Sequence, residues 1–363
     1  MAPRALPAPR EEAVGRKLTG HQKNSLAVLL GIFGSILVSF IIAVALIFVF
    51  SRQPLNTLWY YFVGPFLDSY SLFNMLESSI PLIFSGLGIA IAFKSGVTNL
   101  GGEGQIFSGA IVAVILGSSV PGLPGLAGIV MILAAGAAAG AALAGISGVL
   151  RMKFKISDLL TSYLISSGIV YIINYLILGP FRDPAKITIQ SVSIPSSYTL
   201  ARFLPPSYIH TGIFIALLTA GVMFVVLRKT HFGYELRATG SNPQFARYAG
   251  IDTDRFTVLP MLLSGGLIGL GGAIQIAGRT RSCFTDLTAG LGWNGIAVAL
   301  IARNNPLGVI PAALFYAYLN AGARAAMINS DVTVELANVI SSVIFYLVTA
   351  EAAFAFIRRR LGE

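Results

Sequence analysis

The feature that most constrains this chain is residues 26–50, a stretch of 25 residues that contains no charged side chain. A helix of about 20 apolar residues is long enough to cross the hydrocarbon core of a bilayer. The stretch also exceeds the roughly 7–15-residue apolar core of a cleavable signal peptide, and no small-residue cleavage site is evident. We therefore expect residues 26–50 to form a retained transmembrane helix.

The composition extends this expectation to the whole chain. Its 363 residues are 55% hydrophobic and only 11% charged, whereas soluble domains carry about 25% charged residues. Nine further apolar segments follow, at 72–93, 97–117, 126–150, 159–178, 210–228, 257–278, 291–301, 306–328 and 336–357. We predict an all-α integral membrane protein with about ten transmembrane segments in one domain, residues 26–357. The segment at 291–301 is too short to span alone, so we expect a half-helix or continuity with its flanks.

The distribution of basic residues predicts the orientation of the chain. The net charge is +10, and the basic residues cluster at the ends of apolar segments, which indicates membrane orientation rather than binding to nucleic acid. With both termini cytoplasmic, 18 of the 25 Lys and Arg residues lie inside and seven outside. The basic tail 1–25, expected to be disordered, and the tail 358–363 would then be cytoplasmic. The connection 229–255 would be cytoplasmic as well, and the proline-rich connection 179–209 would be external, able to form a lid or short strands.

Several absences narrow the chemistry. The single cysteine, Cys283, excludes an internal disulfide and a Cys-rich metal site, and the three histidines are far apart, so no metal or other cofactor is expected. No GxxxxGK[ST] motif is present to bind ATP, and neither HExxH nor GxSxG occurs, so the chain is not predicted to be an enzyme. Acidic residues are scattered near segment ends, which weakens a stand-alone ion-coupled carrier and leaves that class open. They are Glu77, Glu103, Asp158, Glu335 and Glu351.

The stretch GVTNLGGEGQ, residues 96–105, places polar side chains and four glycines between two apolar runs. The glycines predict a broken helix, which is tolerated at membrane depth only where protein or water surrounds it. A carboxylate at this depth needs a partner. Glu103 could cap a helix that starts near Gly104 and brace the fold, or it could contact a solute directly. Asn99 and Gln105 flank it as further candidates.

A second polar interruption lies at residues 289–308, where Trp293 and Asn294 follow two glycines and Asn304 and Asn305 precede a proline. The two interruptions could correspond in a duplicated architecture with paired broken helices, as in transporters. Trp293 could stack on a planar solute or belong to an interfacial aromatic belt. The candidate substrate pathway is therefore Asn99, Glu103, Gln105, Trp293, Asn294, Asn304 and Asn305.

Residues 243–250 predict a short amphipathic helix on the cytoplasmic surface. Pro243 occupies a first-turn position, Phe245, Ala246 and Ala249 are apolar, and Gly250 is placed as a stop signal. The alternative is a helix that simply lies on the lipid surface.

Three motifs in order carry a resemblance to a known family: GVTNLGGEGQIFSGA, FGYELRATGSNPQFARYAGI and GIAVALIARNNPLGVIPAAL. With this spacing the chain resembles the membrane permease subunits of bacterial ABC importers of the branched-chain amino acid and ribose permease superfamily, over about residues 26–357. The Glu-Gly-Gln and Ala-Arg-Asn-Asn-Pro forms are most similar to the nucleoside branch, whose binding lipoproteins belong to the basic membrane protein family. One departure is Leu100-Gly101-Gly102, where many relatives have Ile-Gly followed by Ala or Val.

The resemblance implies a multi-pass protein of the bacterial cytoplasmic membrane and a set of partners. These are a second permease chain, identical or different, cytoplasmic ATPase subunits, an extracytoplasmic substrate-binding lipoprotein and membrane lipid. It also implies that 243–250 is a coupling helix bound by the ATPase. The coupling candidates are Glu235, Arg237, Gly240, Asn242, Pro243, Arg247 and Tyr248. The implied solute is a nucleoside, with riboflavin or a simple sugar as the alternative, and Glu103→Gln is expected to lower transport more than expression.

Overall fold

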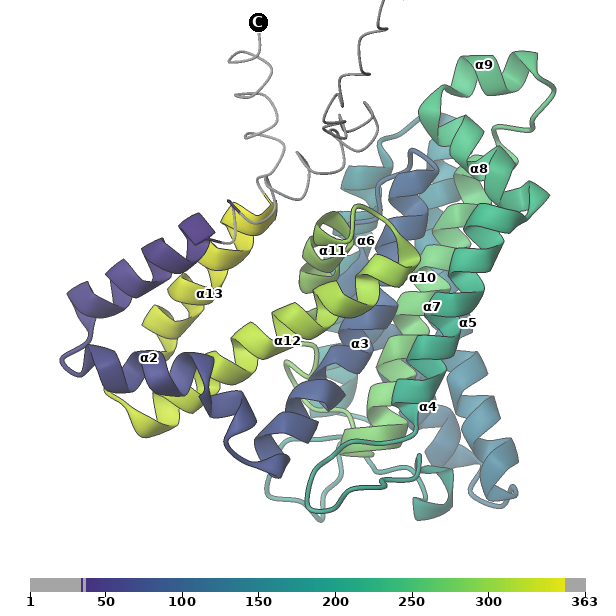
Figure 1. Ribbon diagram of the computed structural model, residues 1–363. Helices are drawn as coiled ribbons and strands as arrows, with labels where there is room; N and C mark the ends of the chain where they lie inside the picture. The colour runs from purple at the N-terminus through teal and green to yellow at the C-terminus, as the bar shows by residue number, and fades with distance from the viewer. Residues whose placement is uncertain (1–33, 35–36, 350–363) are drawn as a thin grey trace, which may run out of the picture.

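The computed structural model describes residue 34 and residues 37–349, and within this part of the chain the regular structure is helical (Figure 1). Six helices are long and apolar enough to cross a membrane. They are α3 (Ser69–Lys94), α5 (Gly125–Phe154), α6 (Asp158–Leu178), α7 (Gly212–Lys229), α10 (Arg255–Gln275) with its π-helical extension η3 (Ile276–Thr280), and α12 (Pro306–Asn329). The prediction of an all-α membrane protein is confirmed. The tails 1–25 and 358–363 and most of residues 26–36 lie outside the described residues.

The remaining helices include those that the sequence marked as broken or short. They are an apolar helix at Leu37–Phe50, α2 (Pro54–Phe62), α4 (Gly102–Ser119), α8 (His231–Ser241), α9 (Pro243–Tyr248), α11 (Leu291–Ile301) and α13 (Val334–Thr349). Each of the ten predicted apolar segments therefore contains helix. The segment predicted at 97–117 is helical only from Gly102, because residues 95–101 form a non-helical return. Helix α2 was not predicted; Pro54 supplies its first residue.

Helix α10 lies at the centre of the main bundle and packs antiparallel to α3. A Cβ atom added to Gly271 would lie 2.9 Å from Cβ of Phe84, and one added to Gly88 would lie 2.7 Å from the Ile268 side chain. On its other side, α10 meets α5 through glycines. A Cβ atom on Gly140 would lie 2.2 Å from the carbonyl oxygen of Gly265, so the two backbones touch only because neither position carries a side chain.

A second group of helices stands beside the main bundle and is joined to it by α12 (Figure 1). Helix Leu37–Phe50, α2 and α13 pack on the C-terminal half of α12 around a separate core that includes Ile47, Tyr61, Leu319 and Ile340. The Tyr61 hydroxyl lies 2.9 Å from the Ser341 hydroxyl across this core. Packing therefore divides the molecule into two helical groups with α12 common to both.

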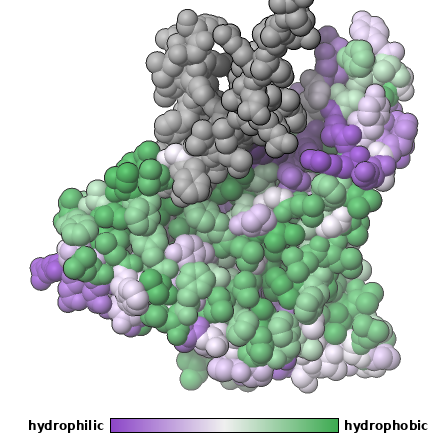
Figure 2. Space-filling view, in the orientation of Figure 1, coloured by the Kyte–Doolittle hydropathy of each residue, from purple (hydrophilic) through white to green (hydrophobic). Residues whose placement is uncertain are grey.

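The two ends of the bundle differ in structure. Helices α8 and α9 project from one end, which we call the α9 end. The connection 179–209 covers the opposite end, which we call the loop end (Figure 1). Between the two ends, Figure 2 shows a broad hydrophobic surface. Large apolar side chains such as Leu126, Leu164 and Tyr171 are exposed on the molecule. A bilayer would cover such a surface.

The connection 179–209 is bound to the end of α10. It forms a short 3₁₀ helix, η2 (Ser196–Tyr198), and isolated bridges instead of the expected short strands. Backbone N–H groups of Ser191, Ile194 and Leu200 donate to carbonyl oxygens at 283, 281 and 277, at 2.7, 2.9 and 2.8 Å. These bonds fix the loop against the residues that follow α10.

Candidate functional site

The two polar interruptions predicted from the sequence meet inside the bundle. A Cβ atom added to Gly102 would lie 2.9 Å from the carbonyl oxygen of Gly292, and one added to Gly292 would lie 2.1 Å from the backbone nitrogen of Glu103. Helices α4 and α11 therefore begin in contact, each after a non-helical segment. The glycine at 102, where relatives were expected to carry Ala or Val, is used for this close approach.

Glu103 caps the neighbouring helix and not its own. Its Oε1 accepts a hydrogen bond from the Gly290 N–H at 3.0 Å and its Oε2 accepts one from the Gly292 N–H at 2.9 Å. These N–H groups belong to the N-cap residue and the second residue of α11, where helical partners are missing and the helix dipole favours negative charge. The N-cap of α4 is Gly101, which makes no side-chain cap. The predicted cap on α4 was wrong, and the bracing of α11 replaces it.

Asn99 and Gln105 are buried and bonded to each other. The Asn99 Nδ2 donates to the Gln105 Oε1 at 2.9 Å and to the Ser264 hydroxyl at 2.8 Å. The Gln105 Nε2 donates in return to the Asn99 Oδ1 at 2.9 Å, and the Gly101 N–H donates to the same oxygen. Both amides therefore hold the non-helical segment before α4 against α10.

Helix α6 satisfies the backbone of the same segment. Its Asp158, Ser162 and Ser166 accept hydrogen bonds from the backbone N–H groups of residues 98, 100 and 104, at 2.5, 3.0 and 2.7 Å. Asp158 also forms an ion pair with Arg151 at the end of α5. Buried backbone donors must find partners, and side chains of α6 supply them here.

The remaining pathway candidates occupy different places along α11. Trp293 is 42% exposed, with its ring 5.8 Å from that of Tyr163. Asn294 lines a cavity and hydrogen bonds to Tyr316. Asn304 and Asn305 lie beyond the opposite end of α11, so the structure does not bring them to the α4–α11 junction.

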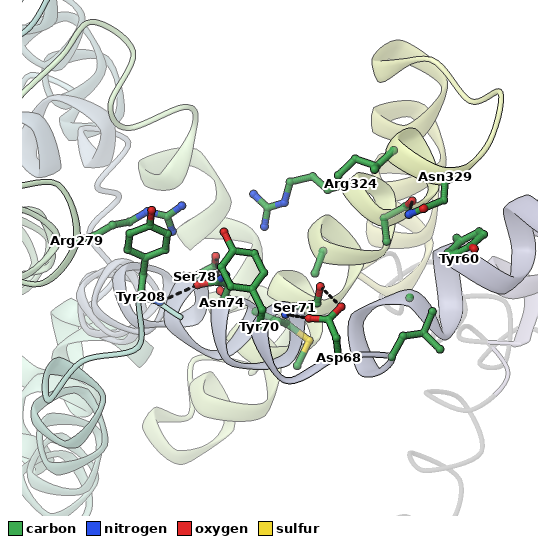
Figure 3. A pocket seen from close by; sticks show the side chains of 16 residues that line it. Tyr60, Asp68, Tyr70, Ser71, Asn74, Ser78, Tyr208, Arg279, Arg324 and Asn329 are labelled. Carbon is green, nitrogen blue, oxygen red and sulfur yellow. Dashed lines mark hydrogen bonds between the residues drawn. The ribbon is translucent and has the colours of Figure 1, made fainter. Parts of the chain in front are cut away.

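Two adjoining cavities lie toward the loop end. The smaller, about 390 Å³, is lined by residues of α3, α10, α11 and α12 and by the segment 284–289. The larger, about 570 Å³, lies between α2, α3 and α12 (Figure 3). The two share Ser78, Arg279 and Arg324, so they are neighbours separated by these side chains, and the smaller lies beside the start of α11.

A charged cluster forms a wall of these cavities. Glu77, buried in α3, forms an ion pair with Arg279, which the π-helical turn η3 holds at the end of α10. Two guanidinium groups contact the Tyr208 ring, with the Arg202 and Arg279 Cζ atoms 4.9 and 5.4 Å from its centre. The Tyr208 N–H also donates to the Asn74 Oδ1 at 2.9 Å. These contacts fasten the end of the 179–209 connection to α3 and α10.

His210 completes the cluster as a neutral ring. Burial, together with the positive charges of Arg202 and Arg279, lowers the pKa of His210 to about 4. Its Nδ1 accepts a hydrogen bond from the Gly212 N–H at 3.1 Å, so the Nε2 atom carries the proton of the neutral ring. The 4.0 Å approach of Nε2 to Glu77 is therefore a contact of an uncharged imidazole.

Most residues of this charged cluster were not predicted from the sequence as functional. Glu77 stood out only as one of several scattered acids, and Arg279, Arg324 and Tyr208 were not singled out. A usable signal existed for Arg324, since it interrupts the apolar segment 306–328, and an arginine inside a predicted span marks a functional position by default.

At the α9 end, the predicted short helix is confirmed. Pro243 begins α9, and the Asn242 Oδ1 caps it by accepting from the Phe245 N–H at 3.0 Å. Gly250 adopts a left-handed conformation (φ +82°), which ends the helix as expected. Phe245 and Tyr248 are 63% and 92% exposed, so α9 presents two aromatic side chains to its surroundings.

Most of the other coupling candidates make local contacts, and Gly240 joins α8 to the bundle. Arg247 donates to the Thr253 hydroxyl at 3.1 Å, and Glu235 lies 3.5 Å from His231. The Arg237 Nη1 is buried without a hydrogen-bond partner among the described residues. A Cβ atom on Gly240 would lie only 2.1 Å from the Lys94 carbonyl oxygen, so α8 rests directly on the end of α3.

This helical membrane fold, with paired broken helices and a polar cavity beside their junction, defines a transport permease. Residues 71–349 match the family model described as the permease component of the branched-chain amino acid transport system, and the chain belongs to this family. The resemblance found in the sequence is confirmed. No solved structure matches the chain.

Curated relatives cover nearly the same length. The guanosine ABC transporter permease protein NupP of Bacillus subtilis is 30% identical over 83% of this chain and 87% of its own. The probable riboflavin import permease protein RfuC of Treponema pallidum is 28% identical over 90% and 85%. The nucleoside ABC transporter permease protein NupB of Lactococcus lactis is 28% identical over 82% and 84%. The chain is thus a multi-pass permease of the bacterial inner membrane and not an enzyme, and ATP hydrolysis lies in a separate subunit.

Proposed function

We propose that the chain forms the translocation pathway for nucleosides in an ATP-driven importer. The α9 end then faces the cytoplasm and its ATPase subunits, and the loop end faces the substrate-binding lipoprotein outside. The relatives named for guanosine and for nucleosides support this solute class, and the relative named for riboflavin supports the alternative. A second permease chain, identical or different, closes the pathway.

The observation that carries the proposal is the lining of the cavity beside α11. Amide and phenol groups converge there, supplied by Gln275, Asn294, Tyr316 and Asn320, among apolar residues of α3 and α11. Small-molecule sites fix the orientation of a ligand through a few placed polar groups, and charged side chains such as Glu77 and Arg279 line this cavity as well. A nucleoside is uncharged, contains a planar base and carries several hydrogen-bonding groups, so it suits this lining.

The path runs from the loop-end cavity past Asn294 to the α4–α11 junction. Glu103 holds the start of α11 there through two backbone hydrogen bonds. Asn99 and Gln105 brace the facing segment, and Asn304 and Asn305 lie at the cytoplasmic exit. Trp293 stands on the surface of the bundle next to this path, where lipid or the second permease chain covers it.

Coupling to ATP hydrolysis runs through α8 and α9. The exposed aromatic rings of Phe245 and Tyr248 offer a contact for the ATPase, with Arg247 and Glu235 as polar neighbours. The close contact of Gly240 with the end of α3 transmits movement of α8 to that helix. Helix α3 carries Glu77 near its other end, so a rigid-body shift at the α9 end reaches the cavity wall and alternates access.

Reconstitution of the complete importer tests the proposal. We expect a binding protein loaded with guanosine to stimulate ATP hydrolysis and uptake into vesicles, and Arg247→Ala to reduce uptake per ATP while the protein remains in the membrane. Stimulation by riboflavin or glucose and not by any nucleoside would refute the solute assignment. Uptake that needs no ATPase would refute the importer mechanism as a whole.

A further inference from the structure

Arg324 is an arginine inside a membrane span that has no ion-pair partner among the described residues. It lies five residues before the end of α12. Its exposed side chain forms neither an ion pair nor a hydrogen bond with any described residue, and its charge interactions with described residues are attraction to Glu77 and repulsion from Arg279. Figure 3 shows its guanidinium group projecting from α12 into the larger cavity, facing Arg279 and Tyr208.

Glu77 is the nearby acid of the span, and its negative charge attracts Arg324 without forming an ion pair with it. Glu77 is committed to Arg279 through their ion pair and contacts His210 on its other side. An arginine in the hydrocarbon region is costly unless it faces a partner or a water-filled cavity. Arg324 lines both cavities, so its guanidinium group is placed to meet whatever occupies that space.

The charges of the lining decide what kind of ligand fits. The two cavities are lined by three carboxylates, Asp68, Glu77 and Asp286, and by two guanidinium groups, Arg279 and Arg324. A phosphorylated ligand would meet more negative than positive charge. A neutral ligand that offers hydrogen-bond acceptors to Arg324 avoids this repulsion.

We propose that Arg324 is a specificity-determining residue that binds two adjacent acceptor atoms, a carbonyl oxygen and a ring nitrogen, on the edge of a planar heterocycle. In a purine nucleoside these atoms are O6 and N7 of guanine or hypoxanthine. The planar guanidinium group presents two parallel N–H donors that match such a pair. Tyr70 and Tyr316, which line the larger and the smaller cavity, supply faces for the ring to stack on.

This inference rests on the proposed nucleoside function and adds a selectivity to it. Adenosine carries an amino donor where guanosine carries the 6-oxo acceptor, so it would leave one Arg324 donor unpaired. A site built around a hydrogen bond discriminates strongly against an analogue that cannot form it.

The test compares uptake by the complete importer carrying wild-type permease, Arg324→Gln or Arg324→Lys. The probes are guanosine, inosine, adenosine and 7-deazaguanosine, which lacks the N7 acceptor. Because every strain contains the same binding protein, a change in the ratio between two solutes reports the permease alone. Arg182→Gln is the matched control, since this arginine of the 179–209 connection lines neither cavity.

We expect Arg324→Gln to lower the guanosine-to-adenosine ratio of Vmax/KM about tenfold or more, chiefly through KM for guanosine. Arg324→Lys keeps the charge but not the paired donors, so it restores little of this ratio, and Arg182→Gln leaves it unchanged. In the wild type, 7-deazaguanosine is transported less efficiently than guanosine, and in Arg324→Gln the two converge.

An unchanged guanosine-to-adenosine ratio in both Arg324 variants, with normal amounts of protein in the membrane, would overturn the inference and leave the nucleoside importer standing. Stronger competition by guanosine 5′-monophosphate than by guanosine would overturn it in favour of an anion site. Transport of a sugar and of no nucleoside by the wild type would instead refute the proposed function, and this inference with it.

Discussion

Removal of the Glu103 carboxylate should destabilise the start of α11. The carboxylate accepts two backbone hydrogen bonds there, at 3.0 and 2.9 Å. A hydrogen bond to a charged group contributes about 1.5–3 kcal/mol. Glu103→Ala removes both and leaves two N–H groups without a protein partner, so we expect a loss of about 3 kcal/mol or more in the free energy of unfolding.

Glu103→Gln is the more informative change because it preserves shape. The amide oxygen can still accept one of the two bonds, whereas the amide nitrogen faces the other N–H and the charge at the helix N-terminus is lost. The expected cost is about 2 kcal/mol. The sequence led us to expect that Glu103→Gln lowers transport more than expression. The two hydrogen bonds to α11 now lead us to expect a loss of stability together with the loss of transport.

Thermal unfolding of the purified, detergent-solubilised protein, together with its amount in the membrane, measures this effect. The expected order of stability is wild type, Glu103→Gln, Glu103→Ala. Glu235→Gln is the control, because it removes a carboxylate from a helix-surface pair with the exposed His231, and such pairs contribute at most about 0.5 kcal/mol. A Glu103→Gln protein as stable as the wild type that nevertheless fails to transport would refute the bracing role and favour direct solute contact.

Three further changes test the loop-end cluster and the α8 contact. Glu77→Gln breaks the buried pair with Arg279 and should cost about 3–5 kcal/mol in thermal unfolding; an unchanged melting temperature would contradict it. His210 has a pKa of about 4 in the folded protein, against 6.5 for an unperturbed histidine, so the unfolded chain binds the proton first and stability should fall as the pH drops from 6.5 toward 4. His210→Gln should flatten that dependence in melting curves, and an equal slope in both proteins argues against it. Gly240→Ala places a Cβ atom 2.1 Å from the Lys94 carbonyl oxygen, so α8 must shift, and ATP hydrolysis should proceed with less uptake in reconstituted vesicles; normal uptake would show that this contact does not carry coupling.

The position of each helical segment follows largely from local sequence. An apolar run in lipid must satisfy its own backbone, and an α-helix does so within the segment, so length and apolar content were enough to locate the ten helical segments. Helix α9 was equally predictable, because its start at Pro243 and its stop at Gly250 act within a few residues. Helix α2 was missed because its nine residues include polar side chains and form no long apolar run.

The sequence by itself determined that this chain is a helical membrane protein, where its helices break and which family it resembles. Only the tertiary structure decided that Glu103 caps a helix whose first residues lie 187 and 189 positions away. It also decided that Glu77, Arg279 and Arg324 meet around one cavity. The physical reason is that caps and apolar runs act between neighbours along the chain, whereas ion pairs and cavities depend on which helices pack together. That packing is set by glycine contacts such as Gly102 with Gly292, whose partners no local pattern reveals.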